Sequence, residues 1–197
     1  MFSAVVDFEK AVANFFGAPY AVATDCCTHA IELCLRYKHI RTISVPKQTY
    51  LSVPMLAMKL NINLSWVNSR WCDYYYLAGN IYDAAVLWEK DSYISDSYMC
   101  ISFQHSKHLS LDRGGIILCS TLEDYNVLKA MSYDGRDLSI VPWAKQDVST
   151  VGYHYYMTPE SAQLGLMKLP EAIAAKPKKW TYADYPDVSR MGVFRDY

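Results

Sequence analysis

The sequence predicts an α/β fold in which helices pack against a mostly parallel sheet. Short apolar, β-branched runs alternate along the chain with segments whose apolar residues recur at helical spacing, and this alternation is typical of βαβ units. The chain has 197 residues, of which 52% are hydrophobic and 20% are charged. It is therefore long enough to bury its own core and too apolar to be disordered. We expect one main domain.

Each element is predicted from its own pattern. Apolar spacing predicts five helices, at residues 5–17, 28–37, 50–60, 121–135 and 158–173. Gly17 and Gly135 are expected to stop the first and fourth of these helices. Thr28 and Thr158 are expected N-caps, and Pro159 takes a first helical position. Compact apolar runs predict strands at 20–26, 42–46, 64–67, 98–103 and 115–120, with a further strand ending near Asp83. Residues 68–82 are ambiguous, and residues 176–197 show no periodicity.

The charge balance excludes several classes of partner. Lys and Arg number 19 and Asp and Glu number 20, which gives a net charge of −1. Such a chain is not expected to bind nucleic acid or an anionic membrane through bulk charge. No apolar run approaches the roughly 20 residues that span a bilayer, and the N-terminus lacks the basic start of a secretory signal. A cytoplasmic protein is therefore expected.

The six cysteines follow no metal-binding or redox spacing. None forms a CxxC pair, and several lie in apolar runs such as GIILCS at 115–120. We expect buried, reduced thiols, with neither disulfides nor a metal site.

The residues that follow the predicted strands indicate where chemistry could occur, because ligands of open α/β sheets bind beyond the carboxyl ends of the strands. Residues 26–29 begin a helix, whose free N–H groups favour an anion such as phosphate. Tyr50 and Lys107 each follow a strand, and Asp83 ends one. A lysine that can react with a carbonyl and a carboxylate that can pair with a pyridinium nitrogen are the two groups that pyridoxal phosphate needs.

The predicted strands and the residues that follow them occur in the same order as in the DegT/DnrJ/EryC1/StrS family of sugar aminotransferases, and the chain resembles this family. The family belongs to the fold-type-I pyridoxal-phosphate (PLP) enzymes. The resemblance covers residues 8 to about 170 and is most specific at SFQHSKHLSLDRGG, where Ser102, Lys107 and Gly114-Gly115 fit the family pattern. It implies a three-layer α/β/α large domain over residues 1–175. Residues 176–197 would form a short tail in place of the family's small C-terminal domain.

The resemblance also implies roles for individual residues. Lys107 would hold PLP as an internal aldimine and transfer protons, Asp83 would pair with the pyridine nitrogen, and Tyr50 would stack on the ring. The phosphate would be bound by the Cys27 backbone, Thr28 and Ser102.

A homodimer with shared active sites follows from the same resemblance. His154 stands where the family commonly has an Asn that reaches the phosphate in the neighbouring subunit. Three positions depart from the family: Cys27 replaces a Gly, Val86 replaces a Gln or His that contacts the cofactor, and Tyr156 replaces an Arg. The segment between residues 67 and 83 is also shorter than in the family.

The function implied is a ping-pong aminotransferase. Glu or Gln is the expected donor, and the keto acceptor is a small molecule, with a nucleotide-linked keto-sugar as the leading class. Candidate groups for an anionic substrate are Lys47, His105, His108, Arg113 and Arg136.

Three alternatives remain open from the sequence. One is a PLP-binding protein without transaminase activity, in a regulatory or assembly role. Another is an aminotransferase that acts on amino acids and keto acids rather than sugars. The third, a dehydratase, is disfavoured because that branch of the family replaces the Schiff-base lysine with histidine.

Overall fold

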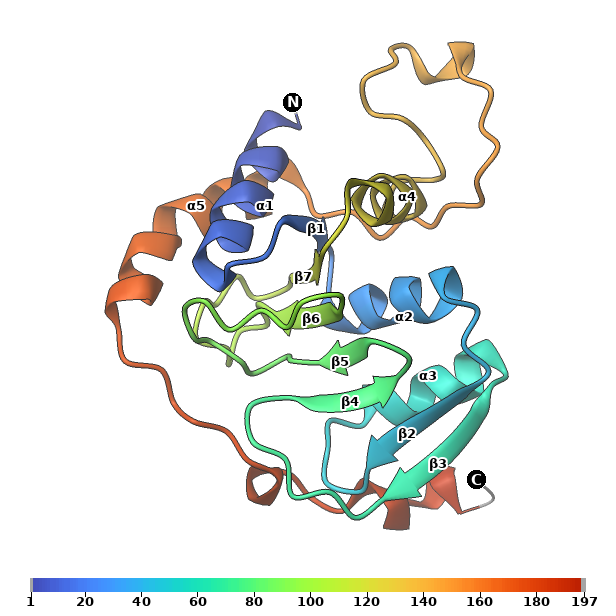
Figure 1. Ribbon diagram of the computed structural model, residues 1–197, viewed down its shortest axis with the longest axis vertical. Helices are drawn as coiled ribbons and strands as arrows, with labels where there is room; N and C mark the ends of the chain where they lie inside the picture. Colours follow the sequence, from blue (N-terminus) through green and yellow to red (C-terminus); the bar gives the residue numbers. More distant parts are fainter. Residues whose placement is uncertain (1, 196–197) are drawn as a thin grey trace.

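The computed structural model describes residues 2–195 and places the larger of its two sheets between two layers of helices, with α3 packed on the smaller one (Figure 1). The larger sheet has the order β1-β7-β6-β5-β4. Its strands are β1 (Tyr20–Thr24), β4 (Tyr75–Ala78), β5 (Ile81–Asp83), β6 (Tyr98–Ser102) and β7 (Gly115–Cys119). The second sheet is a parallel pair, β2 (Thr42–Pro46) and β3 (Asn63–Val67), and β2 lies next to β4.

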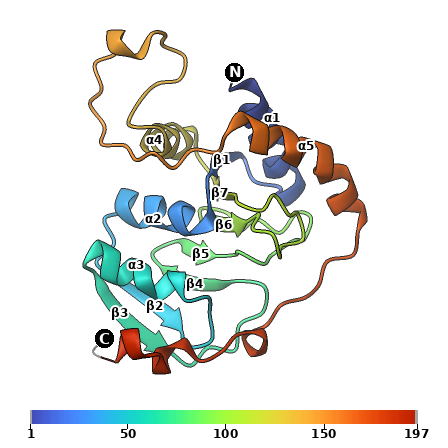
Figure 2. The same cartoon turned by 180° about the vertical axis from the view of Figure 1, so that it is seen from behind.

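The helices divide between the two faces of the sheet. One face is covered by α2 (Cys27–Tyr37), α3 (Ser52–Leu60) and α4 (Leu122–Ser132), and the other by α1 (Ser3–Phe16) and α5 (Pro159–Ala174). The view from behind shows α5 crossing α1 on the same side (Figure 2). Short 3₁₀ helices follow at η1 (Trp143–Lys145), η2 (Tyr182–Asp184), η3 (Val188–Arg190) and η4 (Gly192–Phe194). The predicted three-layer α/β/α architecture is therefore confirmed.

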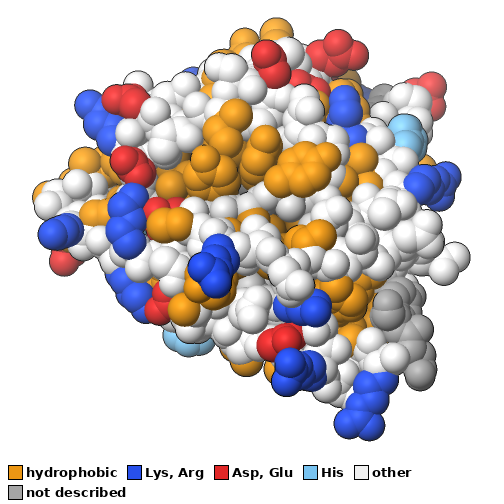
Figure 3. Space-filling model, turned by 60° about the horizontal axis from the view of Figure 1, so that its bottom comes forward, with side chains coloured by type: hydrophobic (Ala, Val, Ile, Leu, Met, Phe, Trp, Pro, Cys, Tyr) orange, Lys and Arg blue, Asp and Glu red, His pale blue; other side chains and the backbone are white. Residues whose placement is uncertain are grey.

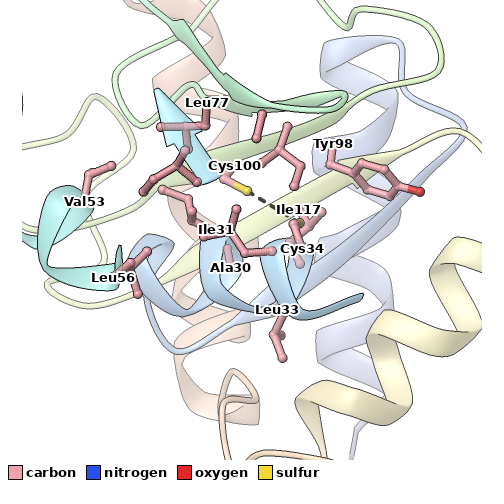
Figure 4. Packing of buried hydrophobic residues seen from close by; sticks show 14 of the residues in the cluster. Ala30, Ile31, Leu33, Cys34, Val53, Leu56, Leu77, Tyr98, Cys100 and Ile117 are labelled. Atoms are coloured by element: carbon pink, nitrogen blue, oxygen red, sulfur yellow. Dashed lines mark hydrogen bonds between the residues drawn. The ribbon is translucent and has the colours of Figure 1, made fainter. Parts of the chain in front are cut away.

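Each layer buries its own apolar core, because successive side chains of a strand point to opposite faces. Cys100 and Ile117 pack against Ile31 and Cys34 of α2 (Figure 4), whereas Met99 contributes to the core under α1 and α5. The Sγ atoms of Cys34 and Cys100 lie 3.9 Å apart and form a hydrogen bond.

The prediction of burial is correct for most of the cysteines. All six cysteines are free, and four are buried: Cys27, Cys34, Cys100 and Cys119. Cys72 is exposed. It lies in the segment before β4, for which the sequence predicts no clear element.

The strand directions correct the expectation of a mostly parallel sheet. Of the five strand pairings, β2–β3 and β5–β6 are parallel and the other three are antiparallel. Parallel neighbours need a crossover of about a dozen residues or more, usually a helix. The turn at Gly79 and Asn80 is too short for such a crossover, and β4 and β5 are antiparallel. Residues 103–114 contain no helix, and β6 and β7 are antiparallel as well.

Most helix ends agree with the sequence signals. Gly17 ends α1 in the left-handed conformation at φ 74°, and the Thr158 hydroxyl accepts a hydrogen bond from the Ser161 N–H at the start of α5. The prediction of Thr28 as an N-cap is wrong, because the N-cap of α2 lies two residues earlier, at Cys26. The Thr28 hydroxyl instead bonds to that of Ser52, at 2.8 Å.

The C-terminal part of the chain leaves α5 and passes along the edge of the domain to lie near β3 (Figure 1). The structure describes residues 176–195 of the predicted tail; residues 196 and 197 lie outside the described part. The division into a domain at 1–175 and a tail at 176–197 remains a prediction. Among the described residues, no helix has the length and apolar character needed to cross a membrane.

Gly115 sets the position of α2 relative to the sheet. A Cβ atom on Gly115 would lie 2.4 Å from the backbone nitrogen of Cys27, a distance at which two heavy atoms overlap. The Gly at the start of β7 therefore allows the N-terminal end of α2 to lie directly against the strand.

We predict that Gly115→Ala destabilises the protein by about 3 kcal/mol, the upper end of the usual range for overpacking, because the clash is with backbone. Gly192→Ala is the matched control, since nothing lies within 4 Å of a Cβ atom there. Chemical denaturation measures both. Equal stability of the two variants would contradict the close approach of α2 to β7.

Candidate functional site

A cavity of about 340 Å³ lies at the carboxyl ends of β5 and β6, between the start of α2 and residues 176–195. Small-molecule sites typically measure roughly 300–1,000 Å³. Six of the seven residues predicted to form the site line this cavity, although they come from distant parts of the chain: Cys27, Thr28, Tyr50, Asp83, Ser102 and Lys107.

Asp83 and Lys107 are the central charged pair of the cavity. Asp83 ends β5 and is 5% exposed, whereas Lys107 is half-buried in the loop after β6. Burial raises the pKa of Asp83 and lowers the pKa of Lys107, and the attraction between the two charges opposes both shifts. Desolvation outweighs that attraction at each group. The lowered pKa increases the share of free amine on Lys107, which is the form that attacks a carbonyl carbon.

A buried tyrosine supports the Asp83 carboxylate. The Tyr75 hydroxyl donates to Asp83 Oδ2 at 2.5 Å and also bonds to the Thr49 hydroxyl at 2.5 Å. The Ala85 N–H donates to Asp83 Oδ1 at 2.9 Å. Burial and the charge on Asp83 raise the pKa of Tyr75 well above its ordinary value, so this phenol stays protonated and can donate.

The support from Tyr75 follows from the strand register and could not be predicted from the sequence. Tyr75 in β4 pairs directly with Asp83 in β5 across the antiparallel ladder. The sequence shows three consecutive tyrosines, 74–76, and their order alone does not indicate which one faces inward. The structure buries Tyr75 and exposes Tyr74 and Tyr76.

The N-terminal end of α2 forms the polar end of the cavity. The Cys27 thiol donates to the Cys100 carbonyl at 3.4 Å, so this side chain points into the core while its backbone faces the cavity. Burial raises the pKa of the Cys27 thiol, which keeps it neutral. The first turn of a helix leaves its N–H groups without intrahelical acceptors, and this arrangement favours an anion beside Cys27 and Thr28.

Tyr50 and Ser102 complete the predicted set. Tyr50 lies between β2 and α3 and is 59% exposed, so its ring is available to a ligand. Ser102 ends β6, and its hydroxyl accepts a hydrogen bond from the Gln104 N–H at 3.3 Å.

His154 does not line the cavity within this chain. Its Nδ1 lies 3.0 Å from Asp134 Oδ2, and its side chain is 70% exposed. It follows residues 136–152, which we call the arm and which extend away from the domain in both views (Figures 1 and 2). The structure therefore places His154 on the surface, beside the arm.

Of the candidate groups for an anionic substrate, Arg113 is the one that lines the cavity. His108 instead bonds to the Ala172 carbonyl at 2.8 Å, and Arg136 packs over the rings of Tyr133 and Trp143. Lys47 and His105 also lie outside the cavity lining.

A polar cluster lies at the edge of the cavity, in front of α2. Asp25 Oδ1 lies 2.7 Å from His29 Nδ1, and Asp25 Oδ2 accepts from Arg113 at 2.6 Å. Burial disfavours the charged imidazole of His29, but its hydrogen bonds with Asp25 and Cys26 outweigh burial and raise its pKa to about 9. Asp25, Cys26 and His29 are close enough to share a metal ion. The neighbouring Arg113 and the charged His29 disfavour a cation there.

Several cavity residues could not be identified from the sequence. Trp71, Trp180 and Tyr185 line the cavity, but they lie before β4 and in the aperiodic C-terminal segment. No local pattern marks them, because their position depends on contacts between distant parts of the chain.

The three-layer fold of this chain is also found in solved structures of aminotransferases. Residues 2–74 match the model of the DegT/DnrJ/EryC1/StrS aminotransferase family. Spr1654 from Streptococcus pneumoniae in its PLP form has a TM-score of 0.72 at 16% identity, over 87% of this chain and 60% of that one. AtS13 from Actinomadura melliaura has a TM-score of 0.72 at 18% identity, over 86% of this chain and 60% of that one.

The sugar aminotransferase CalS13 from Micromonospora echinospora gives a TM-score of 0.70 at 12% identity, over 86% of this chain and 61% of that one. A comparison with curated protein sequences found no match. The chain thus spans about 60% of the length of these solved structures. The predicted family resemblance is confirmed, by sequence over residues 2–74 and by fold over most of the chain.

We predict that Tyr75→Phe raises the pKa of Asp83 further and lowers the free energy of unfolding at neutral pH by about 2 kcal/mol, because a buried carboxylate loses a donor. The ordinary pKa of Asp is 3.8, and the folded value is higher, so stability falls as pH rises from the unfolded to the folded value. In Tyr75→Phe, the free energy of unfolding should keep falling up to a higher pH than in wild type.

Denaturation across pH and carboxyl NMR measure these changes. Tyr76→Phe is the matched control, because Tyr76 lies next in the same strand and is 49% exposed. An unchanged pH profile in Tyr75→Phe would show that the hydroxyl does not support the carboxylate.

The His29 cluster predicts a second pH dependence. The pKa rises from 6.5 to about 9 on folding, so the stabilising charge is fully present below pH 6.5 and is lost as pH rises through 9. Wild type should lose about 2 kcal/mol across this window, allowing for partial exposure, and His29→Gln should lose much less. The exposed His39 supplies the control His39→Gln. If wild type and His29→Gln lose stability in parallel, the cluster does not carry this charge.

Proposed function

We propose that this protein is a PLP-dependent aminotransferase whose active site is the cavity around Lys107 and Asp83. The observation that carries this proposal is the joint placement of three chemically distinct groups. These are a lysine with a lowered pKa, a fully buried carboxylate and the open N-terminal end of a helix, all on one cavity. The family match over residues 2–74 supports the same activity.

The donor set of the cavity fits PLP. The start of α2 suits the phosphate, and Gly115 keeps that helix end close to the sheet. Asp83 suits a protonated pyridine nitrogen, since a positive charge beside this buried carboxylate would compensate its desolvation. Lys107 suits the aldehyde carbon. Cys27 presents no obstacle to the phosphate, because its thiol points into the core.

When bound, PLP supplies an electron sink for the carbanion that forms when an amino acid loses its α-proton. In the proposed mechanism, Lys107 would hold the cofactor through its amine until the substrate amine displaces it, and the freed Lys107 amine would then move a proton between the substrate α-carbon and C4′ of the cofactor. Asp83, held by Tyr75 and the Ala85 N–H, keeps the pyridine nitrogen protonated. Tyr50 covers the ring, and Thr28 and Ser102 contact the phosphate.

The proposed substrates are an amino acid donor, Glu or Gln, and a small keto acceptor in a ping-pong cycle. A nucleotide-linked keto-sugar is the leading acceptor class, as one solved structure of the same fold is that of a sugar aminotransferase. Arg113 on the cavity edge is the candidate for binding an anionic group of either substrate.

A homodimer with shared sites is part of the proposal. The arm carries exposed apolar side chains, with Val141 82%, Trp143 61% and Val151 75% exposed, which are costly to leave in water. Figure 3 shows further hydrophobic side chains gathered in a band on one face of the molecule. In the dimer, His154 would contact the phosphate in the neighbouring subunit.

One observation favours a second candidate, a PLP-binding protein without transaminase activity. Val86 lines the cavity and cannot hydrogen-bond to the cofactor, where the resembled family has Gln or His. The retained pair of Lys107 and Asp83 argues against this reading, because binding without catalysis does not need a protonated ring.

We predict that PLP added to the protein produces the visible absorption band of a lysine-bound cofactor. Lys107→Ala should abolish the band, and Lys90→Ala, which alters an exposed lysine, should leave it unchanged. Glu or Gln should then convert the wild-type band to that of the amine form. Asp83→Asn should slow this conversion roughly 100-fold, the usual size of a lost electrostatic contribution.

Two results separate the candidates. A band that persists in Lys107→Ala would refute the site. A wild-type band that no amino donor converts would refute transamination and support the binding protein.

A further inference from the structure

We propose that residues 176–195, here called the C-terminal strap, form one wall of the cavity and that Trp180 is a positioning residue for Lys107. The proposal deepens the proposed function, on which it rests for the role of Lys107. It is carried by the contacts that hold the strap in place and by the aromatic rings that the strap brings to the cavity.

Asp73 anchors the strap through both its backbone and its side chain. Its N–H donates to the Trp180 carbonyl at 2.8 Å, and its Oδ1 accepts from the Trp180 N–H at 3.0 Å. Its Oδ2 accepts from Lys179 Nζ at 3.0 Å. Asp73 is 6% exposed and adopts a positive φ of 60°. The buried Asp73 carboxylate thus binds two residues of the strap, and its backbone holds an unusual conformation there.

A second anchor holds the strap across the ends of β2 and β3. The Val188 N–H donates to the Lys47 carbonyl at 2.8 Å. Further along, the buried ring of Phe194 packs edge-on against Trp66, with centroids 5.5 Å apart. The strap is therefore fixed on both sides of the cavity mouth rather than lying loosely on the surface.

Between these anchors, the strap turns aromatic rings toward the cavity. Trp180 and Tyr185 both line it, and the Tyr185 ring lies 5.4 Å from that of Trp71. Lys107 Nζ lies 5.6 Å from the centroid of the Trp180 ring, while Lys178 Nζ lies over the same ring at 3.7 Å. The effect of Trp180 on Lys107 is therefore mainly to shield the amine from water, since the closer cation–π pair is that of Lys178. Trp180 and Asp83 therefore both line the cavity into which the Lys107 side chain extends.

This arrangement makes the properties of Lys107 depend on the strap. Burial lowers the pKa of Lys107, while Asp83 and Cys27 on the cavity wall oppose that shift. Without the indole, water would reach the amine and remove part of the desolvation. The side chain would also lose the surface that limits its rotamers. The strap would thus set both the reactivity and the orientation of the amine.

The test compares Trp180→Ala, Trp180→Phe and Asp73→Gly in the full chain. Glycine keeps the left-handed backbone of residue 73 and removes its carboxylate. Met167→Ala, which alters an exposed side chain on α5 away from the cavity and the arm, is the control. The first measurement uses no cofactor: the pH dependence of acetylation of Lys107 by acetic anhydride, read by peptide mass spectrometry with Lys90 as internal reference.

We expect the apparent pKa of Lys107 to rise by about one unit in Trp180→Ala and Asp73→Gly, the size of a partial loss of desolvation. Trp180→Phe and Met167→Ala should remain close to wild type. The second measurement is PLP binding by absorbance, where the same two variants should weaken binding about tenfold. Circular dichroism verifies that each variant folds. If Trp180→Ala does not fold, Asp73→Gly tests whether the strap sets the environment of Lys107.

An apparent pKa of Lys107 that stays at the wild-type value in folded Asp73→Gly or Trp180→Ala would overturn the proposal. If wild type does not bind PLP, the proposed function fails, but acetylation still decides whether the strap shapes the environment of Lys107. If PLP binds to all variants with equal affinity and Lys107 titrates alike in all, the strap is a surface segment only.

Discussion

The site depends on the burial of one carboxylate. Asp83 lies at the end of a short strand with 5% of its surface exposed, and removing its charge from water is costly unless other groups replace the lost hydration. Three parts of the chain supply those groups: Tyr75 in β4, the Ala85 N–H after β5 and the charge of Lys107 after β6. The same contacts that stabilise Asp83 therefore hold together the strands that form the cavity.

The sequence could predict the residues whose positions follow from local patterns. Asp83, Ser102 and Lys107 lie at or after the ends of apolar strands, and Thr28 lies at the start of a helix, so the topology of an α/β sheet brings them to one edge. Tyr75 could not be predicted, because its inward direction depends on the register between β4 and β5. Trp180 could not be predicted either, since Asp73, its anchor, lies more than 100 residues earlier.

The differences between prediction and structure have physical causes. Strand directions are set by the length of the connections, and the alternation of strands and helices did not show that β4 and β5 share a tight turn. Residue type favours Thr28 over Cys26 as the N-cap of α2, but Cys26, two residues earlier, has the extended backbone that the position needs. The phosphate role of His154 needs a second subunit, which the fold of one chain does not provide.

The run of tyrosines at 74–76 has a consequence for how the hairpin of β4 and β5 can change. A slip of one residue in a strand exchanges its two faces, and insertions in surface turns such as Gly79-Asn80 are a common source of such slips. Here a slip in either direction would place Tyr74 or Tyr76 opposite Asp83, in the position now held by Tyr75. The same slip would turn the buried Leu77 of β4 to solvent, so the register is held by the apolar burial of the strand and not by the tyrosines, any of which could supply the hydroxyl.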